Sequence, residues 1–491
     1  LWVIPLSLYL LTFVLAFARF PWIPPQFVVM VLPLVLLLQV LGSAPGWVHP
    51  IWVPLLLHLA AFFVVALACH GELARRRPPA RHLTRFYLAI AAGGVLGGLF
   101  NTLLAPLLFT STAEYPLMLL LGYLVVPRPH APEDQTPKIN SLDIWLPLVL
   151  GVLLATLLLG IRFGNPPGGE TASSLLLVLA GVICYTFARR QVRFVLGLGA
   201  LMLISGIGGR IGPSQLVEEE RNFFGTVRVV DRASEDSPGL VIREFIHGTT
   251  IHGKQRIDPD PARRREPLTY YFRDGPMGQI FQDLPPDRRR VAVLGLGVGT
   301  LASYAEARQE WTFFEIDPAV LHIADAYFTY LADARERGVA IRVELGDARL
   351  FLARTPDHSL DLIFADAFSS DAVPVHLLTR QALQLYRTKL TAGGVIVWNA
   401  QNRYLDLEPV LGDLAADAGL VCRARQETAA EISSAEKQQG KTPCHWVVMA
   451  QSEKDLGALA SSPEWKAVTG RPGARVWTDD FSNLLSIIQW H

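Results

Sequence analysis

Two carboxylates follow a short apolar segment in the second half of the chain. The segment DLIF (361–364) is typical of a buried strand, and the residues after it, ADAFSSDAVP, include Asp366 and Asp371. A carboxylate at the end of a buried strand is costly to desolvate unless something uses its charge. We therefore expect Asp366 to accept a proton or to bind a cation. The alternative is a turn residue, because DAFSSD is rich in turn-forming residues.

The elements that would position Asp366 are short apolar segments separated by stretches of helical length. Five of them occur: VAVLGLG (291–297), WTFFEID (311–317), IRVELGD (341–347), LDLIFAD (360–366) and GVIVWNA (394–400). This alternation predicts a parallel sheet with helices on both faces, a Rossmann-like (methyltransferase-type) α/β domain at 283–491. Ligands bind such sheets beyond the carboxyl ends of the strands, which is where Asp366 lies.

Shorter features surround this domain. Strand-like segments at 223–231, 240–248 and 267–272 predict a small β subdomain at 209–282. The segments 421–427 and 444–451 predict an antiparallel pair at the edge of the main sheet.

The first predicted strands end in groups that suit a nucleoside. The turn GLGVGT carries three glycines: Gly295, Gly297 and Gly299. Such a turn lets a ligand approach the backbone, although the motif alone is weak. Glu315, twenty residues after Gly295, has the spacing of an acid that binds ribose hydroxyls. Asp347 could accept from an adenine amino group beside Ala348, or cap the helix that begins at 348.

Long apolar segments dominate the chain up to residue 208. Hydrophobic residues make up 51% of the chain and charged residues only 18%, which is unusual for a soluble enzyme. A membrane span needs about 17 to 20 apolar residues, so we predict a helical membrane domain at 1–208. Its seven spans are 1–19, 26–42, 51–69, 86–109, 144–162, 174–188 and 192–207, and the shorter segment 115–126 would be an eighth.

Basic loops bear on the orientation of these spans. The loop ELARRRPPARHLTR (72–85) should be cytoplasmic. If 115–126 crosses the membrane, span parity puts the C-terminal domain outside. If it does not, the domain is inside and the basic cluster at 189–193 falls on the external side.

Because the chain begins with Leu1 inside an apolar segment, we also expect it to be processed, truncated or a fragment.

Other residue types narrow the function. The net charge is zero, so nothing indicates nucleic acid binding. The four cysteines form no CxxC motif, which argues against a zinc site or redox pair. We favour free thiols, although a Cys422–Cys444 disulfide is left open. His247 and His252 lack a third ligand nearby, so packing or contact with a substrate is favoured over a metal site.

Several stretches together resemble the spermidine synthase family of aminopropyltransferases, and most closely its membrane-fused bacterial branch. They are RNFFGTVRV, HGTTIHGKQ, PLTYYFRDGPMG, VLGLGVGT, FFEIDPAVL, GDARLFL, DAFSSDAVPVHLLT and WTDDFSNLL. The resemblance implies transfer of an aminopropyl group from decarboxylated S-adenosylmethionine to an amine such as putrescine, with methylthioadenosine released. It implies a multi-pass protein in the bilayer of the bacterial inner membrane, and it leaves a homodimer open. The basic loop 72–85 and the cytosolic supply of sulfonium donors favour a cytoplasmic catalytic domain.

The resemblance also implies roles for single residues. Asp366 matches the catalytic Asp. The glycine turn, Glu315 and Asp347 match the nucleoside-binding groups. Five further residues fall where the family binds its acceptor: Gln255, Tyr270, Tyr271, Asp371 and Asp480. Asp371 lies one position beyond the expected one, and Asp480 could equally cap a following helix.

Two departures keep other functions open. Val298 stands in the glycine turn where the family usually has an Asp for the donor's amino group, and His247 also replaces an Asp. Another enzyme of S-adenosylmethionine, such as a methyltransferase, cyclase or lyase, therefore remains an alternative. A transporter with a nucleoside-sensing domain is disfavoured, because the predicted spans contain almost no ionisable residue.

Overall fold

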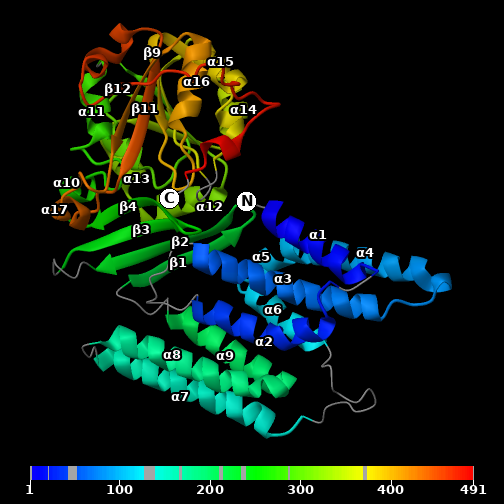
Figure 1. Cartoon of the computed structure of the whole chain (residues 1–491). Coiled ribbons are helices and arrows are strands. Elements are labelled where there is room, and N and C mark those ends of the chain that lie inside the picture. Colours follow the sequence, from blue (N-terminus) through cyan, green and yellow to red (C-terminus); the bar gives the residue numbers. More distant parts are fainter. Residues whose placement is uncertain are drawn as a thin grey trace. The chain divides into compact units, whose positions relative to one another are not determined.

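The computed structural model of the chain describes residues 3–19, 22–42, 52–126, 139–164, 168–208, 214–233, 239–285, 288–368 and 373–489. The chain forms two compact units, Leu1–Gly212 and Pro213–His491 (Figure 1). The first unit is helical. The second contains both sheets.

Apolar helices make up the first unit. They are α1 (Val3–Phe17), α2 (Pro25–Gly42), α3 (Trp52–Arg75), α4 (Leu83–Leu99), α5 (Ala105–Leu108), α6 (Glu114–Val125), α7 (Leu142–Gly164), α8 (Gly169–Thr186) and α9 (Gln191–Gly208), with short turns η1 (Ala80–His82), η2 (Phe100–Leu104) and η3 (Phe187–Arg189). Within the residues that the structure describes, five stretches are long and apolar enough to cross a membrane: Pro25–Gly42, Trp52–Arg75, Ala80–Leu108, Leu142–Ile161 and Thr171–Arg189.

The helices occupy the places that hydropathy predicts, but not all of them have the length of a span. Val3–Phe17, Glu114–Val125 and Gln191–Gly206 are apolar and shorter than the other five.

The basic clusters carry less free charge than their sequence suggests. Arg193 pairs with Asp143 at 2.9 Å and Arg190 with the same carboxylate at 3.6 Å. Glu72 likewise pairs with Arg75 at 2.8 Å. Because these arginines are paired with carboxylates, their number is weaker evidence for the orientation of the spans in the membrane.

The second unit begins with a four-stranded antiparallel sheet. Its strands, β1 (Ser214–Asn222), β2 (Gly225–Ala233), β3 (Val241–His247) and β4 (Thr250–Ile257), pair in chain order. The expected strand at 267–272 is instead an irregular segment. Thr269 has a positive φ of 63°, which a regular strand does not tolerate, and it forms only an isolated bridge with Lys441. The short helices α10 (Pro261–Arg264) and α11 (Pro276–Asp283) flank this segment.

The main sheet has eight strands in the order β12-β10-β11-β9-β8-β5-β6-β7. The strands β9 (Leu390–Asn399), β8 (Leu360–Ala365), β5 (Arg290–Leu294), β6 (Glu310–Glu315) and β7 (Ala340–Leu345) are parallel. The strands β11 (Cys444–Ala450), β10 (Val421–Glu427) and β12 (Lys466–Ala467) add an antiparallel edge. The predicted Rossmann-like sheet and its edge pair are confirmed. Cys422 and Cys444 are buried and free.

Helices cover both faces of the sheet, so each face buries its own core. On one face α11, α12 (Pro318–Tyr327) and α13 (Tyr330–Glu336) pack against Val291, Val293 and Trp311. On the other, α14 (Ala348–Arg354), α15 (Arg380–Lys389) and α16 (Glu408–Ala418) pack against Leu294 and Ile363 (Figure 1). The remaining helical pieces are α17 (Ser434–Gln438), η4 (Thr300–Tyr304), η5 (Val375–Leu377), η6 (Glu453–Ala460) and η7 (Leu484–Ile487). This arrangement leaves the carboxyl ends of the parallel strands for a site.

Candidate active site

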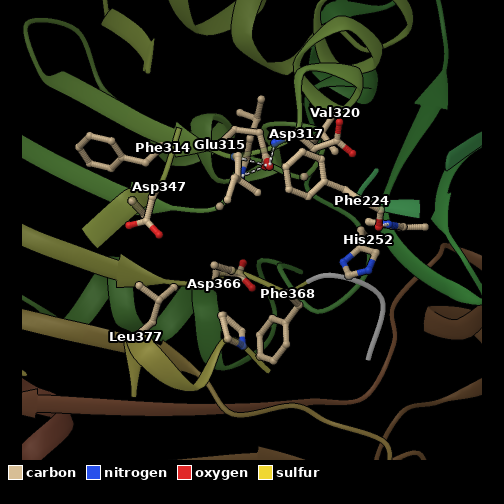
Figure 2. A pocket seen from close by; sticks show the side chains of 18 of the residues that line it. Phe224, His252, Phe314, Glu315, Asp317, Val320, Asp347, Asp366, Phe368 and Leu377 are labelled. Atoms are coloured by element: carbon tan, nitrogen blue, oxygen red, sulfur yellow. Dashed lines mark hydrogen bonds between the residues drawn. The ribbon is translucent and has the colours of Figure 1, made fainter. Parts of the chain in front are cut away.

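A cavity lies at the carboxyl ends of β5, β6, β7 and β8. Residues of the small sheet, including Phe224, His247 and His252, line it from the opposite side. Figure 2 shows Asp366 between two ends of this cavity, with Asp347 and Leu377 towards one end and His252 and Phe224 towards the other. The cavity therefore joins the groups that the sequence places at separate strand ends.

Asp366 follows β8 and is held by hydrogen bonds on both carboxylate oxygens. The hydroxyl of Tyr271 donates to Oδ2, and Nδ2 of Asn399 donates to Oδ1 at 2.8 Å. Oδ1 of Asn399 accepts from the backbone of Gln401 at 2.9 Å, which orients the amide so that its nitrogen faces Asp366. Burial raises the pKa of Asp366 to about 6, although the two hydrogen bonds act in the opposite direction. The carboxylate is thus a fixed base that titrates near neutral pH.

Aromatic side chains support this base. The rings of Tyr270 and Tyr271 lie 4.4 Å apart, and that of Trp446 lies 5.9 Å from Tyr271. The Tyr304 hydroxyl donates to the Tyr271 carbonyl at 2.6 Å, and the Trp446 indole donates to the Tyr270 carbonyl at 3.2 Å. Burial raises the pKa of both cavity tyrosines, so they remain phenols and can donate hydrogen bonds.

The glycine turn lies against the backbone of Asp366. Gly295 has a φ of 100°, and a Cβ there would lie 2.4 Å from the Asp366 carbonyl oxygen. Gly297 also has a positive φ, 54°, and a Cβ there would lie 3.1 Å from the His252 carbonyl oxygen. Both glycines line the cavity. The turn requires glycine for its conformation and for the close approach of two neighbouring chains.

Glu315 ends β6 with its carboxylate in the cavity. One oxygen accepts from the backbone N–H groups of Ile316 and Asp317 at 2.8 and 2.9 Å, and the other accepts from Leu296 at 3.1 Å. Burial raises its pKa against these hydrogen bonds. The three donors fix the carboxylate in place and leave one free position, on Oε2, that can accept from a ligand hydroxyl.

Asp347 caps a helix and also lines the cavity. Its Oδ1 caps α14 by accepting from the Leu350 N–H at 2.9 Å, while its side chain and Ala348 also line the cavity. Its Oδ2 lies 3.3 Å from Nε2 of His376. A cap occupies only part of a carboxylate, so Asp347 can still accept from a ligand amino group.

Three of the predicted site residues lie outside this cavity. The Gln255 amide is used within the fold: it donates to Thr329 and Arg264 and accepts from the Thr329 N–H. Gly299 packs against Leu331, where a Cβ would lie 2.7 Å from a methyl carbon. Asp480 is exposed in a separate hollow. Asp371 lies outside the described residues.

Two side chains at the site are not predicted from the sequence. Asn399 lies at the end of the predicted strand 394–400, and it carries the same signal as Asp366: a polar residue at the end of a buried segment. Phe224 has no comparable signal, because it reaches the cavity only through the fold of the β1–β2 hairpin. Asp479, next to Asp480, pairs with Arg349 at 2.8 Å and accepts from Thr379 at 2.7 Å.

The charged groups around the cavity have one sign. Its described lining includes the carboxylates of Glu315, Asp317, Asp347 and Asp366. It includes three histidines, but no lysine or arginine among the residues that the structure describes. In the same part of the chain, no group of three or more His, Cys, Asp or Glu side chains is arranged to hold a metal ion. The cavity is suited to a cationic ligand with a nucleoside part.

The second unit is thus a Rossmann-like domain with a carboxylate-lined cavity at the carboxyl ends of its parallel strands. No family model matches the chain. The chain is similar to a polyamine aminopropyltransferase of Vibrio vulnificus, with 28% identity over 196 residues, which is 38% of this chain and 60% of that protein. A probable polyamine aminopropyl transferase of Bifidobacterium longum is 31% identical over 110 residues, 22% of this chain and 23% of that protein. The chain thus spans less than two thirds of either relative, and both confirm the resemblance to the spermidine synthase family.

Solved structures were also compared. The spermidine synthase of Thermotoga maritima aligns with a TM-score of 0.33 and 15% identity, over 54% of this chain and 82% of that one. A probable spermidine synthase of Corynebacterium glutamicum aligns with a TM-score of 0.36 and 14% identity, over 55% of this chain and 98% of that one. A methyltransferase of Archaeoglobus fulgidus has a TM-score of 0.24 and 16% identity over 34% of this chain and 87% of that one.

Proposed function

We propose that this chain is a membrane-anchored aminopropyltransferase that uses decarboxylated S-adenosylmethionine and an amine. One observation carries the proposal: Asp366 is held by Tyr271 and Asn399 in the same cavity that carries Glu315 and Asp347. A base thus lies beside two acids suited to ribose and adenine. The names of the curated relatives support the same reaction.

The charge of the cavity favours the decarboxylated donor over intact S-adenosylmethionine. The decarboxylated donor carries a sulfonium and an ammonium, which the four carboxylates attract. The intact donor adds a carboxylate, and the described lining offers it no lysine or arginine. An unpaired charge in such a cavity is unfavourable. The methyltransferase, cyclase and lyase alternatives are therefore weaker.

The proposed reaction is a single displacement. The acceptor must first lose a proton, since an alkylammonium resembles Lys, with a pKa of about 10. Asp366 accepts that proton and orients the nitrogen. The nitrogen lone pair then forms a bond to the carbon next to the sulfonium, the carbon–sulfur bond breaks, and its electron pair stays on sulfur. The products are the extended amine and methylthioadenosine.

Product analysis tests this proposal. The purified full chain is incubated with decarboxylated S-adenosylmethionine and a panel of mono- and diamines, and separately with the intact donor. Mass spectrometry should find methylthioadenosine together with an amine heavier by one aminopropyl group. Formation of S-adenosylhomocysteine from the intact donor, with no aminopropyl transfer, would instead indicate a methyltransferase.

The pH dependence should report the ionisation of Asp366. Because the carboxylate must be unprotonated, kcat/KM should fall below about pH 6, the pKa of Asp366. The Tyr271 hydrogen bond lowers this pKa, so Tyr271→Phe should move the acidic limb to higher pH. Steady-state profiles from pH 5 to 9 measure it. Tyr304→Phe, whose hydroxyl contacts the Tyr271 backbone and not Asp366, is the matched control. An acidic limb at the same pH in wild type and Tyr271→Phe would contradict the assignment.

We further propose that the chain lies in the bacterial inner membrane with this domain in the cytoplasm. Five long apolar helices and the basic loop 72–85 support it. Ser461, exposed in the second unit, is a position for a reporter cysteine. In intact cells Ser461→Cys should resist a membrane-impermeant maleimide and react only after permeabilisation. Reaction in intact cells would place the domain outside.

A further inference from the structure

One end of the cavity contains a histidine that the proposed reaction does not use. His252, in β4, lines the cavity on the side of Phe224 and Val320, and Asp347 lies towards the other end (Figure 2). Its Nε2 is buried without a hydrogen-bond partner in the part of the chain that the structure describes. Buried polar atoms are almost always paired, so an unpaired one suggests a partner that the protein alone does not supply.

The backbone of β4 holds His252 over the glycine turn. The His252 carbonyl oxygen lies against Gly297, and the next residue, Gly253, packs on the Val298 side chain, where a Cβ would lie 2.3 Å from a methyl carbon. Val298 is 1% exposed. The turn therefore presents no polar side chain to the cavity at this point, and β4 places an imidazole there instead.

The neighbouring histidine is not equivalent. Nε2 of His247 lies 3.0 Å from the Phe224 carbonyl oxygen, so His247 holds the β1–β2 hairpin. The rings of His247 and His252 are 5.9 Å apart. Burial, together with His247, lowers the pKa of His252 to about 4, so its imidazole is neutral at pH 7. A neutral imidazole can accept a hydrogen bond from an ammonium and does not repel a sulfonium.

We propose that His252 binds the ammonium of the donor's aminopropyl tail, at the end of the cavity where the glycine turn contributes no polar side chain. The inference rests on the proposed function, because it assumes a nucleoside whose ribose and adenine lie at Glu315 and Asp347. A tail that starts at a sulfur near Asp366 and points away from Asp347 runs towards His252. His252 is thus a positioning residue, which aligns the reacting carbon by holding the far end of the tail.

Two ligands that differ in the tail test this role. Decarboxylated S-adenosylmethionine carries the aminopropyl tail with its ammonium on a sulfonium, and methylthioadenosine has the same nucleoside with a neutral thioether and no tail. In calorimetry with the detergent-solubilised full chain, His252→Leu should weaken the first ligand about 10- to 100-fold, the range for a hydrogen bond to a charged group. Methylthioadenosine should bind within twofold of wild type. His252→Asn, which keeps a polar group, should lose less than His252→Leu.

A control variant distinguishes binding of the tail by His252 from a structural role of this residue. His376→Ala, at the Asp347 end of the cavity, should weaken both ligands by the same factor. Equal weakening of both ligands by His252→Leu would make His252 structural and overturn the inference, as would unchanged affinity for the charged ligand. If His252→Leu fails to fold, a His252→Asn variant with wild-type preference between the ligands supports it, and one with equal losses overturns it. A wild-type chain that binds neither ligand would instead refute the proposed function.

Discussion

Replacing Asp366 by Asn is expected to lower kcat by about 10²–10⁴-fold, the usual cost of losing a general base. The change keeps the side-chain shape but removes the proton acceptor. Tyr271 can still donate to the Asn oxygen, whereas the new amide nitrogen would face the Asn399 nitrogen or force a flip. Donor binding should persist, because the proposed nucleoside contacts lie at Glu315 and Asp347. Steady-state kinetics and calorimetry with methylthioadenosine measure the two effects.

Two further variants test whether the loss of kcat in Asp366→Asn comes from the loss of a base. Asn399→Asp keeps the size of the orienting residue but places a second carboxylate beside Asp366, so it should raise the pKa of the base and lower kcat at pH 7. Asp371→Asn should raise the KM of a diamine more than it lowers kcat, since holding a distant ammonium is largely uniform binding. If Asp366→Asn keeps more than about a tenth of wild-type kcat, corresponding to about 1.4 kcal/mol of barrier, Asp366 is a turn residue.

The strand ends were predictable from sequence because the information is local. Strands buried on both faces read as continuous apolar segments, and a carboxylate that interrupts the end of one is conspicuous. Glu315, Asp347 and Asp366 were recognised in this way, and all three line one cavity. The helix cap at Asp347 was also predictable, since an Asp before a helix is a common cap.

Contacts between distant segments were not predictable in the same way. Asn399 reaches Asp366 because β9 lies beside β8 with Trp398 paired to Ala365, a register that no local pattern fixes. Gln255 was placed over the site by resemblance. The structure instead uses its amide to join Thr329 and the Arg264 carbonyl. Among the helices, hydropathy located every apolar segment, but whether a helix of 12 or 15 residues spans a membrane depends on its surroundings.

Removing the Glu315 carboxylate should have the second largest effect. The hydrogen bonds in the structure indicate that it lowers stability as well as ligand affinity. Glu315→Ala removes the acceptor of three backbone N–H groups, those of Leu296, Ile316 and Asp317. Each buried donor left unpaired costs about 1–3 kcal/mol, so this variant should lose stability as well as affinity. An affinity measured on Glu315→Ala alone would therefore not distinguish a lost ligand contact from a loss of stability.

Glu315→Gln separates them. The amide oxygen can keep the two N–H groups on one side, Ile316 and Asp317, while the charge is lost. Methylthioadenosine should bind about 10- to 100-fold more weakly, the loss of one charge-assisted bond of about 1.5–3 kcal/mol. The thermal midpoint should fall less than in Glu315→Ala, because only the Leu296 N–H loses its acceptor. Asp347→Asn, whose cap oxygen remains, should weaken binding similarly. Calorimetry gives the affinities and thermal unfolding the stability. Wild-type affinity in both Glu315→Gln and Asp347→Asn would mean that these carboxylates serve the turn and the helix cap only, and that the nucleoside, if it binds, lies elsewhere.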